Sequence, residues 1–501
     1  MNPARPTSPN DSDGRDLSSV RHKPPVRQAT ILTTNFASCR SAEQSAQRAT
    51  LEVAGGGLTA KRPITTAFRP IQYLGNKSRL TSEIVGILTD AIPSGVRVGD
   101  LFSGTSVVGR ALKSRHPITA VDVQAFAAIL GHAMLTGHPA DVEEGLTPDF
   151  RASFEEAAGL LVAQFTPLID LEHHAMVDAF NGDVLLLASL IDGGSTAAYR
   201  QCCAVSNGRL VAALRSVMRA VGGKTENATA SYYFGGVYFS YVQAVHLDAI
   251  ATAIDRAPAK SQHILRAALL STCSEIVNTV GKQFAQPMRI LKDGKVPHSL
   301  LVRRTIRDRS YDVFTIFQHH LRRWRSSLSD CRLKHTVVQG DVLAFLDVDD
   351  QCEAFYADPP YTIDHYSRFY HVLETIVLRD APVLAEMKKG GRERVMRGVY
   401  RANRHQSLFC VPSTAPKAFE QLFYKIGRRG APLLLSYSGY DDPHGERPRL
   451  LLLHELQSIA RQFFRRVEII TPSFEGYRRL NMANTNNTVK RDTERLILCW
   501  G

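Results

Sequence analysis

The sequence predicts an α/β fold in which a doubly wound sheet is interrupted by a long helical segment. An apolar strand pattern at residues 96–102, a turn of small residues, a helical pattern and a second strand pattern at 118–123 follow one another. A doubly wound sheet begins in this way. From about residue 125 to 335 the apolar spacing is mainly helical, and strand–helix alternation resumes at residue 353. We therefore expect one α/β domain that is split by a mainly helical insert.

The individual elements rest on short patterns. Leu80, Ile84 and Leu88 stand at helical spacing within residues 77–92. Four apolar runs predict strands in the second half, and the last two are close enough to form a terminal hairpin: 353–361, 431–440, 465–472 and 494–500.

We divide the chain at three places. Residues 1–65 are rich in Ser, Thr, Arg, Pro and Ala and show little apolar periodicity, which predicts a disordered N-terminal tail. The first part of the α/β core then covers residues 66–125, the helical insert covers 126–335, and the second part of the core covers 336–501.

The composition is that of a globular protein, because 44% of the 501 residues are hydrophobic and 22% are charged. A collagen-like, coiled-coil or wholly disordered chain is excluded. The formal net charge of +13 favours a polyanionic partner such as nucleic acid. We find no apolar run of the roughly 20 residues that span a membrane and no secretory signal, so we expect a cytoplasmic protein. The eight cysteines form no CxxC pair, and we expect no metal site.

A loop of unusual chemistry, Asp358-Pro359-Pro360-Tyr361, follows one of the predicted strands. Proline fixes φ and lacks an N–H, so this loop is stiff and its carbonyls are free acceptors. The Asp358 carboxylate and the Pro359 carbonyl suit the two N–H bonds of an amino group conjugated to a ring, and Tyr361 offers a face for stacking. The loop therefore predicts methylation of such an amine, and the alternative is a Pro-rich turn with a solvated Asp.

A turn of small residues covers 100–109, between the first predicted strand and a helix. Small residues let the backbone approach a ligand, and a helix N-terminus favours negative charge. Asp122 ends the next strand, where an acid can accept hydrogen bonds from ribose hydroxyls. The alternative is an ordinary strand-to-helix turn.

Together these motifs resemble the Dam-like, alpha-type family of adenine-specific DNA methyltransferases. The family's Asp-x-Phe-x-Gly stands at 100–104, far upstream of Asp-Pro-Pro-Tyr, and residues 73–80 resemble its leading Tyr-x-Gly-x-Lys motif. Asp341 lies 17 residues before Asp358, where the family carries an acid that contacts the cofactor. The resemblance covers residues 70–125 and 335–500.

The resemblance implies a Rossmann-like, S-adenosylmethionine-dependent methyltransferase sheet that is split by a helical recognition insert. It implies site-specific methylation of adenine N6 in duplex DNA, in the prokaryotic cytoplasm with the nucleoid, and a cognate restriction endonuclease as a candidate partner. Methylation of RNA adenine or of cytosine N4 is the nearest alternative, and a catalytically inactive DNA-binding fold is another. Asp rather than Ser before Pro-Pro-Tyr favours adenine within the family. The sequence sets neither the recognition site nor the oligomeric state.

The resemblance also implies the roles of single residues. Asp122 would bind the ribose of the cofactor and Asp341 its adenine, while Lys77 would lie near its carboxylate. The amino acid end would be held by Asp100 and the turn, and the full set of implied cofactor-binding residues is Tyr73, Lys77, Asp100, Phe102, Gly104, Asp122 and Asp341. The target adenine would be held by Asp358, Pro359, Pro360 and Tyr361. Without the resemblance, Asp341 is explained equally well as a helix N-cap, and Lys77 is explained as a solvated lysine at the start of a helix.

One position departs from the family, which usually has Gly where this chain has Ser106. A Cβ at this position would crowd the cofactor, or cost about 1 kcal/mol if φ must be positive. We therefore expect weakened cofactor binding.

Flipping an adenine out of a duplex costs a few kcal/mol and requires phosphate contacts. Two basic stretches qualify, 303–325 and 388–404, and we expect the second to be a mobile DNA-contacting loop; solvated faces are the alternative. The segments 231–240 and 278–287 resemble family segments near the target base, and the alternative is that they are core aromatics and turns. Aromatic residues within 366–370 could fill the gap that the flipped base leaves, or could be core residues.

Overall fold

The computed structural model describes residues 68–501 except 76, 224, 293, 297–298, 364, 390, 439–448 and 473–493. The predicted N-terminal tail lies outside the described residues. No described helix is long and apolar enough to cross a membrane.

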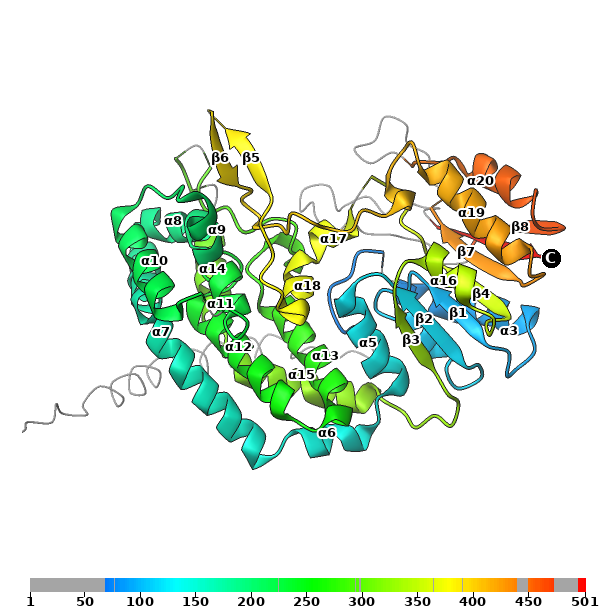
Figure 1. The fold of residues 1–501 in the computed structure, drawn as a ribbon, viewed down its shortest axis with the longest axis horizontal. Helices are drawn as coiled ribbons and strands as arrows, with labels where there is room; N and C mark the ends of the chain where they lie inside the picture. The colour runs from blue at the N-terminus through cyan, green and yellow to red at the C-terminus, as the bar shows by residue number, and fades with distance from the viewer. Residues whose placement is uncertain are drawn as a thin grey trace, which may run out of the picture. The chain divides into compact units, whose positions relative to one another are not determined.

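The centre of the α/β region is a seven-stranded sheet with the order β3-β2-β1-β4-β7-β9-β8 (Figure 1). Parallel pairing joins β3, β2, β1, β4 and β7, whereas β9 is antiparallel to both of its neighbours. The strand order reverses between β1 and β4, which makes the sheet doubly wound and compatible with a Rossmann-like methyltransferase. The strands are β1 (Val98–Leu101), β2 (Ile118–Asp122), β3 (Thr336–Gln339), β4 (Ala354–Ala357), β7 (Leu433–Tyr437), β8 (Arg466–Ile470) and β9 (Arg495–Trp500).

The predicted terminal hairpin is confirmed, because β8 and β9 pair antiparallel. The edge strand β3 was missed by the sequence analysis. It is only four residues long and none of its side chains is fully buried, so its apolar pattern is weak.

Helices cover both faces of the sheet, since successive side chains along a strand point to opposite faces. In β4, Tyr356 packs in a core with α3 (Thr81–Ala91) and α4 (Val107–Leu112). The next residue back, Phe355, packs in the opposite core with α16 (Val342–Val348), α19 (Ala415–Gly427) and α20 (Leu453–Ala460). The short 3₁₀ helix η1 (Lys77–Arg79) precedes α3, and η3 (Leu408–Cys410) precedes α19.

Between β2 and β3 the described residues form helices and isolated bridges only. The first helix, α5, packs on β2 and β3 and also on α13, so it joins the sheet to the helical region (Figure 1). The helices are α5 (Ala125–Thr136), α6 (Pro139–Gly145), α7 (Pro148–Phe180), α8 (Leu185–Gly193), α9 (Thr196–Cys202), α10 (Gly208–Val221), α11 (Thr229–Phe234), α12 (Tyr241–Arg256), α13 (Ala259–Ile276), η2 (Val280–Lys282), α14 (Ser299–Arg309) and α15 (Val313–Ser327).

The chain that follows the Asp-Pro-Pro-Tyr loop returns to the helical region. Helices α17 (Tyr366–Phe369) and α18 (His371–Leu378) contribute to the helical core. The basic stretch expected to be a loop begins instead as a hairpin of β5 (Glu386–Lys389) and β6 (Arg392–Val395). This hairpin projects beside the gap between the helical region and the sheet (Figure 1).

Candidate functional site

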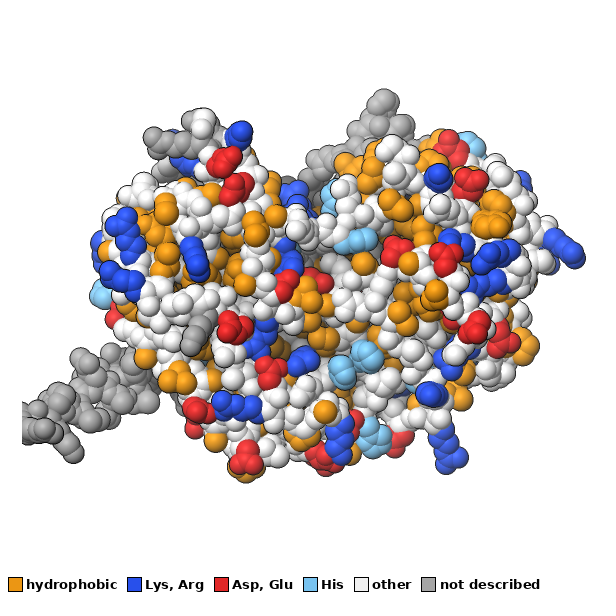
Figure 2. Space-filling model, in the orientation of Figure 1, with side chains coloured by type: hydrophobic (Ala, Val, Ile, Leu, Met, Phe, Trp, Pro, Cys, Tyr) orange, Lys and Arg blue, Asp and Glu red, His pale blue; other side chains and the backbone are white. Residues whose placement is uncertain are grey.

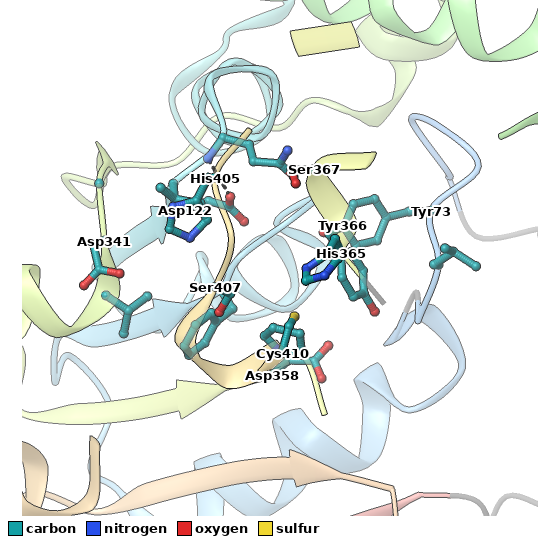
Figure 3. Close-up of a pocket in the computed structure, with 17 residues that line it drawn as sticks. Tyr73, Asp122, Asp341, Asp358, His365, Tyr366, Ser367, His405, Ser407 and Cys410 are labelled. Atoms are coloured by element: carbon teal, nitrogen blue, oxygen red, sulfur yellow. Dashed lines mark hydrogen bonds between the residues drawn. The ribbon is translucent and has the colours of Figure 1, made fainter. Parts of the chain in front are cut away.

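A pocket opens at the carboxyl edge of the sheet, where β2, β3 and β4 end. It encloses about 760 Å³ of atom-free space that includes open solvent. Figure 3 shows acidic side chains and aromatic rings facing it from several elements. The lining residues are Tyr73, Leu74, Phe102, Asp122, Val123, Gln124, Gly340, Asp341, Val342, Asp358, Pro360, His365, Tyr366, Ser367, His405, Ser407 and Cys410.

The turn after β1 has an unusual backbone. Phe102, Gly104 and Ser106 have φ values of 59°, 51° and 53°, which side-chain-bearing residues rarely adopt. Gly104 is required at its position, because a Cβ there would lie 2.9 Å from the Tyr73 ring. The Gly104 N–H donates to Asp122 Oδ2 at 2.9 Å. The turn is therefore fixed to the end of β2 and lies against Tyr73.

Ser106 has the positive φ that was expected to cost energy, and that part of the expectation is confirmed. The expected crowding of the pocket is wrong. A Cβ added to Gly131 of α5 would lie 3.1 Å from Ser106 Oγ, and Ser106 does not line the pocket. The side chain therefore faces α5, where a glycine makes room for it.

Asp100 lies beneath the turn rather than in the pocket. It is 2% exposed, and its Oδ2 accepts the Gly109 N–H of α4 at 3.0 Å. Burial raises the pKa of Asp100 to about 8. The Asp100 carboxyl therefore contacts α4 and does not line the pocket.

Asp122 and Asp341 both line the pocket. Asp122 accepts N–H groups from Gly104 and Gln124, one on each oxygen, and burial raises the pKa of its carboxyl. Asp341 is the N-cap of α16, where its Oδ1 accepts from Leu343 and from the next residue. Each carboxylate oxygen has a further lone pair, so both acids can still accept hydrogen bonds from a ligand.

Asp358 lies in a buried charged cluster. Its Oδ1 is 2.8 Å from Lys77 Nζ, and the same Nζ is 3.4 Å from Glu494 Oε1. Burial raises the pKa of Asp358 to about 6, although the Lys77 ammonium opposes the shift. Burial lowers the pKa of Lys77, but the two carboxylates outweigh it and the pKa lies well above its usual value. The structure places Lys77 on Asp358, whereas the resemblance implied a position near the cofactor carboxylate.

The aromatic residues near Asp358 divide into two groups. Tyr73 stacks on Tyr370 with ring centroids 4.9 Å apart, and Tyr366 lies 5.9 Å from Tyr73; Tyr73 and Tyr366 line the pocket. Tyr361 does not line it. The Arg449 guanidinium lies 4.9 Å over the Tyr361 ring, so the stacking face expected of Tyr361 is already contacted.

Several residues of the site were missed by the sequence analysis. Glu494, which pairs with Lys77, directly precedes β9. His405 and Ser407 line the pocket and come from the segment between the β5–β6 hairpin and η3. Burial lowers the pKa of His405, and the nearby Asp341 carboxylate opposes the shift. None of these residues belongs to a contiguous motif, so the sequence carries no signal for them.

The first basic stretch is largely engaged within the protein. Arg309 is 2% exposed and pairs with the buried Glu172, which corrects the expectation that it contacts a nucleic acid. Asp308 is fully buried and pairs with Arg307, Arg304 and Lys282.

Comparison with known proteins gives one partial similarity. No protein-family model matches the chain. Over 143 residues it is 34% identical to modification methylase LlaI of Lactococcus lactis subsp. lactis, a match that covers 28% of this chain and 19% of that protein. The chain therefore spans about a fifth of the length of the curated relative that it matches.

Proposed function

We propose that the protein is an S-adenosylmethionine-dependent DNA methyltransferase that methylates adenine N6 in duplex DNA. The observation that carries this proposal is the position of Asp358 at the pocket, in the rigid Asp-Pro-Pro-Tyr loop and beside the acidic ends of β2 and β3. The partial similarity to a modification methylase supports the methyl transfer, and Asp before Pro-Pro-Tyr favours adenine as the acceptor.

The pocket residues fit the proposed cofactor. Asp122 is the last residue of β2 and accepts hydrogen bonds from Gly104 of the turn after β1 and from Gln124. Its spare lone pairs suit ribose hydroxyls. Asp341 and His405 face the neighbouring part of the pocket and suit the polar edge of a base. When bound, the cofactor would supply a methyl group on a positively charged sulfur. The carboxylates of Asp122 and Asp341 also complement a cation.

The acceptor amine would be held by Asp358 and Pro359. An amino group conjugated to a ring is a poor nucleophile because its lone pair is delocalised. Hydrogen bonds from its two N–H groups to the Asp358 carboxylate and the Pro359 carbonyl localise that lone pair on nitrogen. The nitrogen would accept the methyl group that the cofactor supplies and would lose one proton. Asp358 would receive that proton and pass it to solvent.

Duplex DNA as the partner is supported by charge. The chain carries a formal net charge of +13, and Lys388 and Arg394 of the β5–β6 hairpin are exposed. Figure 2 shows this face hollowed between the hairpin and the sheet, with Lys and Arg side chains beside the hollow. A two-stranded ribbon of this kind fits the major groove of B-DNA.

The test is transfer of labelled methyl from S-adenosylmethionine to unmethylated duplex DNA, single-stranded DNA and RNA. We expect label in duplex DNA, recovered as N6-methyladenine after digestion. Label in N4-methylcytosine or in RNA would contradict the proposed acceptor. Cofactor binding without transfer to any nucleic acid would contradict the enzymatic function.

A further inference from the structure

Glu494 lies in the same buried cluster as the Asp-Pro-Pro-Tyr loop. Its side chain is 8% exposed, and its Oε1 is 3.4 Å from Lys77 Nζ. The Tyr361 hydroxyl donates to the same oxygen at 3.3 Å. In the part of the chain that the structure describes, Oε2 is buried and has no hydrogen-bond partner. Glu494 therefore contacts both the lysine that pairs with Asp358 and the last residue of the loop.

Lys77 stands between two carboxylates at unequal distances. Its Nζ is 2.8 Å from Asp358 and 3.4 Å from Glu494, and it donates to the Gly75 carbonyl at 3.3 Å. A small displacement of Nζ would bring it closer to Glu494 than to Asp358. Glu494 Oε2 is an acceptor that the described residues leave unused. Leaving a buried acceptor unpaired costs free energy, so a movement of the Lys77 ammonium toward Glu494 is favoured.

This movement of Lys77 matters because its ammonium pairs with Asp358 Oδ1, and the target amine would need the Asp358 carboxylate as its acceptor. An ammonium at 2.8 Å partly neutralises a carboxylate and occupies one of its acceptor positions. Asp358 becomes a stronger acceptor for an amine N–H when Lys77 turns toward Glu494.

We propose that Glu494 is a positioning residue that takes the Lys77 ammonium when the target amine engages Asp358, and that it fixes Tyr361 at the same time. The inference rests on the proposed methyltransferase function. The titratable and charged groups that face Asp358 are Lys77, Glu494, Tyr361, Tyr356, Asp100 and Tyr73. Among these, Glu494 is the carboxylate that shares the lysine.

The experiment compares the full chain with Glu494→Gln and with Glu468→Gln as a matched control. Glu468 lies on β8, next to β9, is 41% exposed and pairs with Arg466. Four quantities are measured: kcat for methyl transfer, the Kd for S-adenosylmethionine, the melting temperature, and the titration midpoint of Asp358. The midpoint is followed by NMR of carboxyl-labelled Asp, and Asp358→Asn assigns the signal.

Glu494→Gln should lower kcat by about 10- to 100-fold, as expected for a misplaced reacting group, and change the cofactor Kd by less than about twofold. The Asp358 midpoint should fall, because a negative neighbour is removed and Lys77 stays on Asp358. Glu468→Gln should leave all four quantities unchanged. A second variant, Glu494→Asp, keeps the charge and should retain the midpoint and recover part of kcat.

An Asp358 midpoint that does not move in Glu494→Gln overturns the inference, as does an unchanged kcat. A purely structural role would lower the melting temperature without moving the midpoint. If the wild type methylates no nucleic acid, the proposed function fails, and the NMR titration still decides whether Glu494 and Asp358 share Lys77. If Glu494→Gln does not fold, Glu494→Asp decides: a lower kcat with an unchanged melting temperature and cofactor Kd supports the inference, and an unchanged kcat overturns it.

Discussion

The helical region and the carboxyl edge of the sheet both bury charged side chains, but they satisfy them differently. In the helical region, Glu172 binds Arg309 through one oxygen and the Tyr241 N–H through the other, and Arg309 also donates to the Gly236 carbonyl. At the sheet edge, Asp122 and the other acids bind backbone N–H groups or a shared ammonium and still face an open pocket. Buried charge that is paired inside the protein holds the fold together. Buried charge with unused acceptors beside a pocket is available for a ligand.

The largest expected effect is on stability, in the helical region. Glu172→Ala leaves the Arg309 guanidinium buried without its partner, so the free energy of unfolding should fall by about 3–5 kcal/mol. Denaturant unfolding measures this. Glu156→Ala is the control, because Glu156 pairs with Arg256 on the surface, and it should cost less than about 1 kcal/mol. Equal small losses in both variants would remove the distinction between the two regions.

The next effect concerns the cofactor at the sheet edge. Asp122→Ala removes a charged acceptor, worth about 1.5–3 kcal/mol, so the Kd for S-adenosylmethionine should rise by about 10- to 100-fold. Isothermal titration calorimetry measures the Kd. Asp347→Ala, on α16 and 55% exposed, should leave the Kd unchanged. A Kd for Asp122→Ala equal to that of the wild type would separate Asp122 from the cofactor.

A smaller effect distinguishes exposed basic residues from paired ones. Lys388→Ala and Arg394→Ala, on the β5–β6 hairpin, should each weaken DNA binding and reduce the slope of log K against log salt by about 1. Arg307→Ala should leave that slope unchanged, because Arg307 pairs with Asp308. Fluorescence anisotropy over a range of salt concentrations measures the slopes. Identical slopes for hairpin variants and wild type would exclude the hairpin from the DNA interface.

The smallest effect is a pH dependence of stability. The pKa of Asp100 is raised to about 8 in the folded protein by burial, so the folded state holds a proton that the unfolded state releases above about pH 4. The stability that protonated Asp100 contributes is fully present below about pH 4 and is lost as the pH rises through about 8. Asp100→Asn mimics the neutral form and should flatten this part of the stability profile. Thermal unfolding from pH 5 to 8.5 measures it, and parallel profiles would contradict the assignment.

Contiguous motifs carried most of what the sequence predicted. The Asp-Pro-Pro-Tyr loop follows β4 and Asp122 ends β2, both as expected. Asp341 caps α16 just after β3, which pairs with β2, so parallel pairing brings the two acids to one edge of the sheet. Most helices and strands were also predictable, because their apolar residues repeat with the period of the element.

Contacts between distant segments could not be predicted. Glu494 reaches Lys77 across 417 positions of the chain, and only the order of the strands brings the two together. The burial of Arg309 depends on Glu172 from another helix, so a basic stretch on its own does not distinguish a DNA-binding surface from an internal ion pair. The direction of the Ser106 side chain depends on Gly131, which no local pattern links to it.

The most direct test of the account is a single-turnover measurement with wild type and Asp358→Ala on unmethylated duplex DNA. Both proteins should bind S-adenosylmethionine with similar Kd. The wild type should transfer labelled methyl to adenine N6, and the variant should be slower by about 10²- to 10³-fold, the loss expected for one positioned polar group at a reacting centre. Equal rates in the two proteins, or a wild type that binds the cofactor and methylates no adenine, would contradict the central claim.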